Sequence, residues 1–323
     1  MPKQFVRAIV ALLIAGCSSN SDPGGASPSI NQHKKAYIGL FGDQAVAVLD
    51  TVTNQVLKTI PVTAPDGLII TPDGKRVYVS STDSGTVKVI STVDDSIATS
   101  IDVGAKPAGI AVTPDGARVV VSVGGANDVA IIDTSTDTVI KQETVAAAHA
   151  SCISADGRYA YVASQATGAP AIVQVDLVGD AKMQAFPVDK SPRMLSCTPT
   201  EIYFTAVGLD AVEMMDLTTY TLGTPIASGG SPHDVRATPD GKFELVVSQT
   251  AGDLEFIDVA TNIVAATVPT GKLAHWITLS SNATSAYVTN EGDNNVVIVD
   301  LAQHRITNTI AIGNAPRKMV IQP

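Results

Sequence analysis

Short runs of aliphatic and β-branched residues recur along the chain, and turn residues separate them. Residues 76–80 and 87–90 are typical examples. Such runs predict β-strands, and no stretch of the chain has sustained helical periodicity. The turn sequence Thr-Pro-Asp-Gly occurs at residues 71–74, 113–116 and 238–241. Because Pro fixes φ and Gly supplies a positive φ, each copy predicts a tight reversal between two strands.

A second marker, an aliphatic strand that ends in Asp, gives the repeat its period. Serine replaces the Asp once. The marker residues are Asp50, Ser91, Asp133, Asp176, Asp216, Asp258 and Asp300. Each period contains four predicted strands, which we call a to d in chain order. Four strands in a repeat of about 40–45 residues are the signature of a β-propeller blade, so residues 36–323 predict seven blades.

The first and last strands of this region predict how the ring of blades closes. Residues 36–40, 45–50 and 55–62 have the patterns of strands b, c and d, and no strand a precedes them. Residues 315–321 supply the missing strand a at the C-terminus. We therefore expect an all-β, seven-bladed propeller of four-stranded blades, in which the C-terminal strand completes the N-terminal blade and hides its edge.

The motif Ala-Tyr-Val-Thr-Asn at residues 286–290, followed by the strand at residues 293–300, carries a resemblance to a known family. With the repeat over residues 36–323, it resembles the YVTN-repeat β-propellers of bacterial and archaeal surface and periplasmic proteins. The resemblance implies a fold of the lactonase-like propeller superfamily. The resemblance also implies similarity to propellers that act as binding or adhesion modules and to propellers that hydrolyse sugar lactones. A more distant similarity is to the propeller domains of nitrous oxide reductase and the haem-binding nitrite reductases.

The N-terminal segment has the pattern of a secretory signal. Lys3 and Arg7 precede an apolar run at residues 8–16, which is too short for a membrane-spanning helix of about 20 residues. The sequence Ile-Ala-Gly-Cys at residues 14–17 resembles a bacterial lipobox, so we predict that Cys17 is lipidated. An ordinary signal peptide with a chance cysteine is the alternative.

Cleavage before Cys17 defines three predicted regions. Residues 1–16 form a lipoprotein signal peptide, residues 17–35 form the lipidated cysteine with a disordered tether, and residues 36–323 form the propeller. We therefore expect a protein of the bacterial cell envelope, membrane-anchored through Cys17 and facing the periplasm or the exterior, with the outer membrane favoured where the cell has one.

Composition narrows the function classes further. Hydrophobic residues make up 45% of the 323 residues and charged residues 16%, which excludes a disordered chain. Lys and Arg number 21 against 31 Asp and Glu, so the formal net charge is −10. An acidic chain repels phosphate backbones, and nucleic acid is therefore not an expected partner. We expect a monomer.

When the seven repeats are aligned, the position that opens strand a forms a column rich in histidine and arginine. Equal phase predicts equal height around the channel, so these side chains are expected to face one another. The column consists of Asp66, Ala108, His149, Arg193, His233, His275 and Arg317. Loops between strands b and c add Gln165, Gln249 and Glu291, and the next column adds Asp234, Trp276 and Lys318.

Convergent polar groups of this kind define a ligand-site hypothesis. Histidine and arginine in an otherwise acidic protein favour an anion, because the arginine fork matches carboxylates and phosphates. The predicted ligand-binding residues are His149, Arg193, His233, His275, Arg317, Trp276 and Gln249. The alternative is a solvated turn that tolerates any polar residue.

Two functions from different classes follow. The first is a lipid-anchored binding or scaffolding module for a protein, a glycan or a small anion. The second is a lactonase- or lyase-type enzyme, in which His275 or His233 acts as general base, Arg193 and Arg317 hold a carboxylate, and Glu291 orients the base. The chain has no GxSxG, P-loop or HExxH motif, and this absence favours binding over catalysis.

No cofactor is predicted. A metal held by His149, His233 and His275 is a less favoured option, because the three side chains would have to meet at about 2.0–2.1 Å from the ion. Cys152 and Cys197 lie on innermost strands of adjacent predicted blades. They are either a disulfide, which an extracytoplasmic compartment permits, or two buried thiols.

Overall fold

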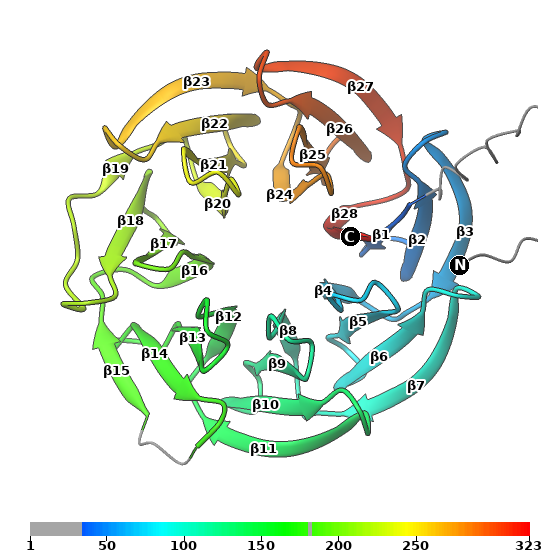
Figure 1. Ribbon diagram of the computed structural model, residues 1–323, viewed down its shortest axis with the longest axis horizontal. Helices are drawn as coiled ribbons and strands as arrows, with labels where there is room; N and C mark the ends of the chain where they lie inside the picture. Colours follow the sequence, from blue (N-terminus) through cyan, green and yellow to red (C-terminus); the bar gives the residue numbers. More distant parts are fainter. Residues whose placement is uncertain (1–33, 180–182) are drawn as a thin grey trace, which may run out of the picture. The chain divides into compact units, whose positions relative to one another are not determined.

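The computed structural model describes residues 34–179 and 183–323. In this part of the chain, 28 strands form seven four-stranded antiparallel sheets, which are arranged as blades in a ring (Figure 1). The expected all-β, seven-bladed propeller is therefore confirmed. The predicted signal peptide, Cys17 and nearly all of the predicted tether lie outside the described residues. Within these two ranges, no helix is long and apolar enough to cross a membrane.

Each blade contains one strand of each type, ordered from the centre of the ring outwards. The innermost strands, type a, are β28 (Pro316–Ile321), β4 (Pro65–Ile70), β8 (Pro107–Val112), β12 (Ala148–Ile153), β16 (Pro192–Cys197), β20 (Pro232–Ala237) and β24 (Ala274–Leu279). The b strands are β1 (Lys35–Leu40), β5 (Arg76–Ser81), β9 (Arg118–Val123), β13 (Tyr159–Ser164), β17 (Glu201–Ala206), β21 (Phe243–Ser248) and β25 (Ser285–Asn290).

The two outer positions of each blade complete the sheets. The c strands are β2 (Ala45–Asp50), β6 (Thr86–Ser91), β10 (Asp128–Asp133), β14 (Ala171–Asp176), β18 (Ala211–Asp216), β22 (Asp253–Asp258) and β26 (Asn295–Asp300). The outermost strands, type d, are β3 (Gln55–Pro61), β7 (Ser96–Asp102), β11 (Thr138–Thr144), β15 (Gln184–Pro187), β19 (Ile226–Ala227), β23 (Ile263–Pro269) and β27 (Arg305–Ala311).

The ring closes as expected, through the C-terminal strand. β28 pairs antiparallel with β1, and the sheet order of this blade is β28-β1-β2-β3. Tyr37 lies opposite Val320 in this pairing. β1 begins at Lys35, one residue before the predicted boundary, and the Lys35 ammonium lies 2.8 Å from a carboxylate oxygen of Asp95 in the next blade.

Both repeated turn motifs act through side-chain hydrogen bonds to the backbone. In the first Thr-Pro-Asp-Gly turn, Asp73 accepts the backbone N–H of Lys75 at 3.1 Å and the Thr71 hydroxyl at 2.6 Å, and Gly74 has φ of 69°. At the end of β2, one oxygen of Asp50 accepts the backbone N–H groups of Val52 and Thr53 at 2.8 and 2.9 Å. Each blade needs the same two turns, and this explains why the two motifs recur at a fixed spacing.

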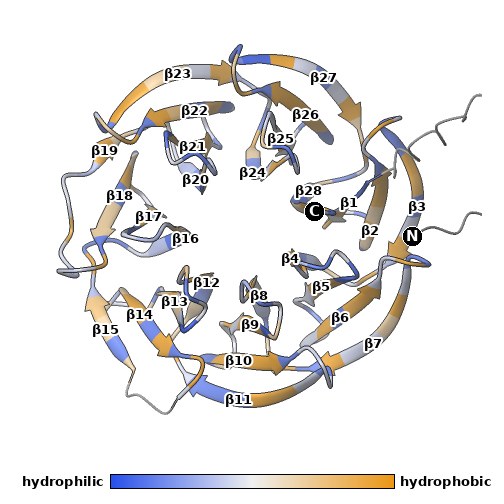
Figure 2. Ribbon diagram, viewed as in Figure 1, coloured by the Kyte–Doolittle hydropathy of each residue, from blue (hydrophilic) through white to orange (hydrophobic). Residues whose placement is uncertain are grey.

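The core lies between neighbouring blades. Tyr37, Val48, Leu68 and Val77 pack together between the first blade and the blade of β4 to β7, and all four are almost completely buried. Strands of the middle layers such as β22 and β26 are largely hydrophobic, whereas the outer strand β11 carries a long hydrophilic stretch (Figure 2). Each blade therefore depends on both neighbours to bury its two faces.

A buried carboxyl group interrupts one of these apolar interfaces. Glu244 on β21 is completely buried, and neither carboxyl oxygen has a hydrogen-bond partner of normal geometry among the described residues. Burial raises the pKa of Glu244 to about 8, although Ser196 and Arg236 act in the opposite direction. The same position of other b strands holds an aliphatic residue, for example Val77 and Ile202.

This burial makes the stability of the propeller depend on Glu244 at alkaline pH. The folded state holds the carboxyl proton up to about pH 8, whereas the unfolded chain releases it near 4.5. The free energy of unfolding should therefore fall between these values, by at most about 1.4 kcal/mol per pH unit. In urea denaturation, Glu244→Gln should become more stable relative to the wild type as pH rises from about 5 to about 9. A pH-independent difference, or the same trend in the control Glu143→Gln on β11, would contradict this.

Candidate functional site

The start of each inner strand is held at a defined height by the preceding blade. In six of the seven blades, the residue just before strand a adopts a left-handed φ, with values such as 45° at Ala64 and 51° at Ala315. In four blades, its backbone N–H donates at 2.8–2.9 Å to a side-chain oxygen from the loop between strands b and c of the preceding blade. The pairs are Ala64 with Gln44, Ala147 with Asn127, Ser231 with Asp210, and Ala315 with Asn294.

Hydroxyl groups on the b strands hold the second residue of strand a in the following blade. Ser80 donates to the carbonyl of Ala108 at 2.6 Å, and Thr289 donates to that of Arg317 at 2.6 Å. These bonds cross from one blade to the next. They position the column of residues that the sequence singles out, which we call the entrance ring: Asp66, Ala108, His149, Arg193, His233, His275 and Arg317.

The structure brings several side chains of the entrance ring into contact. Arg317 lies 3.2 Å from Asp66 and 3.3 Å from Glu291, and its guanidinium also stacks 3.6 Å from the centre of the Phe41 ring. The rings of His233 and His275 lie 4.0 Å apart, centre to centre. Arg317 is therefore already matched by two carboxylates, whereas the histidines contact each other.

The histidines of the entrance ring are held in the neutral form. Burial lowers the pKa of His275 to about 3 and that of His149 to about 4, and it also depresses the pKa of His233. The Nδ1 atoms of His233 and His275 are buried without a hydrogen-bond partner among the described residues. Nε2 of His275 lies 3.8 Å from Glu291, beyond hydrogen-bond distance.

A second layer lies one residue further along the inner strands and is dominated by Trp276. The Arg236 guanidinium lies 4.6 Å and the Lys318 ammonium 4.7 Å from the centre of its ring, as in cation–π contacts. Asp234 accepts the backbone N–H of Ile277 at 3.0 Å and pairs with Arg236 at 3.3 Å. Arg236 was not predicted from the sequence. The sequence does contain a signal for Arg236, because the equivalent position in the other a strands holds mostly small or apolar residues, such as Ala111 and Val320.

Lys318 is the cation of this layer without a hydrogen-bond or ion-pair partner among the described residues. Its residue is only 3% exposed, and its ammonium forms no hydrogen bond or ion pair with the residues that the structure describes. Burial lowers its pKa, although Asp66 and Asp234 act to raise it. Both of these acids already pair with an arginine, Asp66 with Arg317 and Asp234 with Arg236.

The centre of the ring therefore has an excess of positive charge in an acidic protein. Arg193, a further member of the entrance ring, likewise forms no hydrogen bond or ion pair with a residue in the described ranges, although Glu291 acts on it electrostatically. With neutral histidines, the cationic groups outnumber the anionic ones by one. The cations are Arg193, Arg236, Arg317 and Lys318, and the anions are Asp66, Asp234 and Glu291.

The two predicted glutamines contribute less. The Gln165 amide donates to the carbonyl of Pro192 at 2.9 Å and so helps to position the start of β16. Gln249 forms no side-chain hydrogen bond within residues 34–179 and 183–323. Across the same ranges, no three His, Cys, Asp or Glu side chains are grouped as a metal ion would require.

A cavity of about 460 Å³ occupies the channel beyond the entrance ring. All seven inner strands line it, and it extends to the turns between strands a and b at Pro114 and Ser154. Lys318, Arg236 and Trp276 lie in its wall, whereas no member of the entrance ring does. The cavity is thus deeper in the channel than the site that the sequence predicted.

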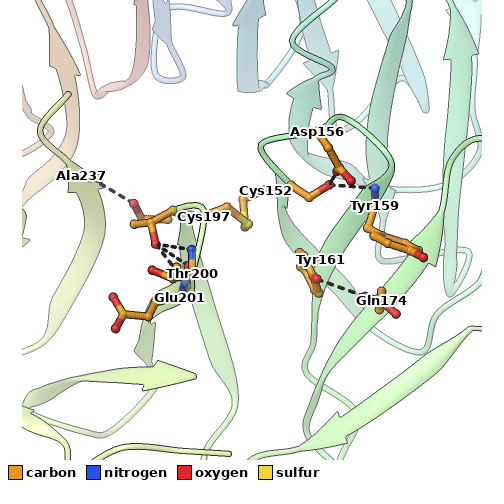
Figure 3. The surroundings of a disulfide bond; sticks show 12 residues. Cys152, Asp156, Tyr159, Tyr161, Gln174, Cys197, Thr200, Glu201 and Ala237 are labelled. Carbon is orange, nitrogen blue, oxygen red and sulfur yellow. Dashed lines mark hydrogen bonds between the residues drawn. A yellow bond between two sulfur atoms is a disulfide. The ribbon is translucent and has the colours of Figure 1, made fainter. Parts of the chain in front are cut away.

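A disulfide joins two inner strands in the wall of this cavity. Cys152 on β12 and Cys197 on β16 are bonded, with 5.7 Å between their Cα atoms (Figure 3). Of the two arrangements that the sequence left open, the structure therefore has the bonded one. The bond crosses from one blade to the next beside Tyr161 and Thr200 (Figure 3).

The fold and this channel define a seven-bladed β-propeller with a polar centre, and comparisons with known proteins agree. The family model for YNCE-like β-propellers matches residues 4–323, and the chain therefore belongs to this family. Comparison with curated protein sequences finds no significant match.

Solved structures resemble the chain over most of its length. Hydrazine synthase of Kuenenia stuttgartiensis is 20% identical, with a TM-score of 0.70 over 79% of this chain and 88% of that one. A protein of unknown function from Desulfotomaculum acetoxidans is 14% identical, with a TM-score of 0.77 over 89% and 98%. A candidate 6-phosphogluconolactonase from Bacteroides fragilis is 16% identical, with a TM-score of 0.76 over 91% and 99%. At these identities the likeness establishes the fold alone.

The disulfide should stabilise the ring. It links residues 45 apart in sequence, and closing a loop of this size is worth about 2–4 kcal/mol. The double variant Cys152→Ala and Cys197→Ala should lose about that much free energy of unfolding in urea. A reducing agent should reproduce the loss in the wild type and leave the variant unchanged. Equal midpoints for oxidised and fully reduced wild-type protein would refute this prediction.

Proposed function

We propose that this protein is an extracytoplasmic, lipid-anchored binding module that takes a small anionic ligand in the central channel of its propeller. The observation that carries the proposal is Lys318, a buried ammonium without a hydrogen-bond or ion-pair partner among the described residues. Burying an unpaired charge is costly, and such groups are normally paired in proteins. An anion in the channel would supply the missing partner.

The arrangement of the neighbouring charges supports this assignment. Asp66 and Asp234 each pair with an arginine, and neither forms an ion pair with Lys318. Arg193 at the entrance adds a second cation without a direct partner among the described residues. Both groups lie in a channel whose low dielectric strengthens an attraction to negative charge.

The geometry favours binding over a hydrolytic role. A general base works best when its pKa lies near the working pH, and burial lowers the pKa of His275 to about 3. Glu291, the residue expected to orient it, is beyond hydrogen-bond distance and also pairs with Arg317. The similarity to a candidate 6-phosphogluconolactonase therefore supports the fold without supporting that reaction.

The proposed location rests on the N-terminal sequence and on the disulfide. Residues 1–16 have the pattern of a signal peptide, and Cys17 is placed as the lipidated residue of a lipobox. The bond between Cys152 and Cys197 supports an oxidising compartment, in which structural disulfides persist.

Calorimetric titration of the purified protein with phosphate, succinate and citrate tests the proposal. The wild type should bind at least one of these anions, and Lys318→Met should weaken that binding by tenfold or more, since bonds to charged groups contribute about 1.5–3 kcal/mol. The matched control is Lys242→Met, which removes an exposed lysine from a turn between strands a and b.

The outcomes separate the alternatives clearly. Loss of affinity in Lys318→Met alone supports the channel site. Equal losses in both variants would indicate a general effect of net charge, and no binding of any anion by the wild type would refute the proposal. Circular dichroism of both variants checks that each is folded.

A further inference from the structure

The cavity beyond the entrance ring has two chemically different halves. The inner strands follow the order β28, β4, β8, β12, β16, β20 and β24 around the ring (Figure 1). All charged residues that line the cavity come from two strands, with Asp234 and Arg236 on β20 and Lys318 on β28, and Trp276 lies on β24 between these strands. The charge is therefore confined to one side.

The side of the cavity formed by β4 and β8, which follows β28 around the ring, is apolar. β4 contributes Leu68 and Ile69 to the lining, and β8 contributes only Gly, Ile, Ala and Val residues, among them Ile110 and Ala111. Pro114 extends this wall into the adjoining turn. An apolar wall facing a few fixed polar groups is typical of sites for small organic ligands, and about 460 Å³ falls within the usual range of about 300–1,000 Å³ for such sites.

Polar bonds between blades hold the charged side in place. The Trp276 indole N–H and the Thr278 hydroxyl both donate to the carbonyl of Met319, at 3.1 and 2.6 Å. The backbone N–H of Ile277 donates to Asp234 at 3.0 Å. These bonds tie β20, β24 and β28 together. Lys318 is therefore presented to the cavity by a preorganised wall, which reduces the ordering cost of binding.

Two cations already lie against the Trp276 ring. Arg236 and Lys318 each lie within 5 Å of its centre, at 4.6 and 4.7 Å. An apolar part of a ligand therefore finds its surface on β4, next to β28, and on β8, where Ile69 and Ala111 line the wall.

From these observations we infer that the ligand is an amphiphilic carboxylate, whose anionic head lies at Lys318 and whose hydrocarbon body lies along β4 and β8. The inference rests on the proposed function and adds the class of ligand. It also assigns the end of the cavity at the turns between strands a and b, near Pro114 and Ser154, as the way in, since the cavity reaches these turns and not the entrance ring.

A chain-length series tests this assignment. Straight-chain carboxylates from acetate to decanoate are titrated into the protein, together with the primary alcohols of the same length. Each added methylene group should strengthen binding by about fourfold until the cavity is filled, because each buries hydrocarbon surface. The alcohols should follow the same trend with weaker affinity, since they lack the charge that Lys318 recognises.

Two variants separate the head from the body of the ligand. Lys318→Met should abolish the advantage of each carboxylate over its alcohol and keep the dependence on chain length. Ala111→Leu should weaken octanoate much more than acetate, because the added side chain takes space on the apolar wall. The wild-type series alone decides the question if Ala111→Leu fails to fold.

Failure of this inference differs from failure of the proposed function. If short anions bind through Lys318 while octanoate binds no more tightly than acetate, the apolar wall is not part of the site and the ligand class is wrong. If no carboxylate of any length binds while phosphate or citrate does, the inference is overturned and the proposed function stands; if none of these anions binds, both are overturned. If each carboxylate keeps the same advantage in affinity over its alcohol in Lys318→Met as in the wild type, the assignment of the anionic head to Lys318 is also rejected.

Discussion

Hydrogen bonding between β1 and β28 is the constraint on which the rest of the molecule depends. The pairing brings residues near both ends of the propeller, such as Tyr37 and Val320, opposite each other in one sheet. Every blade buries its two faces against its neighbours, so an open ring would expose apolar surface and unpaired strand edges. Closure also sets the seven inner strands around one channel. The site exists because strands far apart in sequence are forced to face each other there.

Within that channel, unequal pairing of charges gives the protein its chemical character. Arginines neutralise Asp66 and Asp234, and burial keeps the histidines uncharged. Lys318 is left as a buried cation without a hydrogen-bond or ion-pair partner among the described residues, between the entrance ring and the cavity. The channel of an acidic propeller is thus locally cationic, and this contrast both repels bulk polyanions from the surface and favours a small anion inside.

The repeat made the fold and the entrance ring predictable, because equal phase along the chain becomes equal height around a ring. Side-chain pairing was not predictable in this way. Whether Arg317 reaches Asp66 or a ligand depends on the lengths and directions of side chains from non-adjacent parts of the sequence. The cavity, the contribution of Arg236 and the bond between Cys152 and Cys197 depend on the same three-dimensional detail. Glu244 carries a signal in the sequence, since it is a charge at an aliphatic position of the repeat.

The most direct test of this account is a crystal structure of the protein grown with octanoate. The account predicts carboxylate density within about 2.7–3.2 Å of the Lys318 ammonium, with the hydrocarbon chain against β4 and β8. It would be contradicted by a structure in which Lys318 pairs with Asp66 or Asp234 and the channel holds only water at that octanoate concentration.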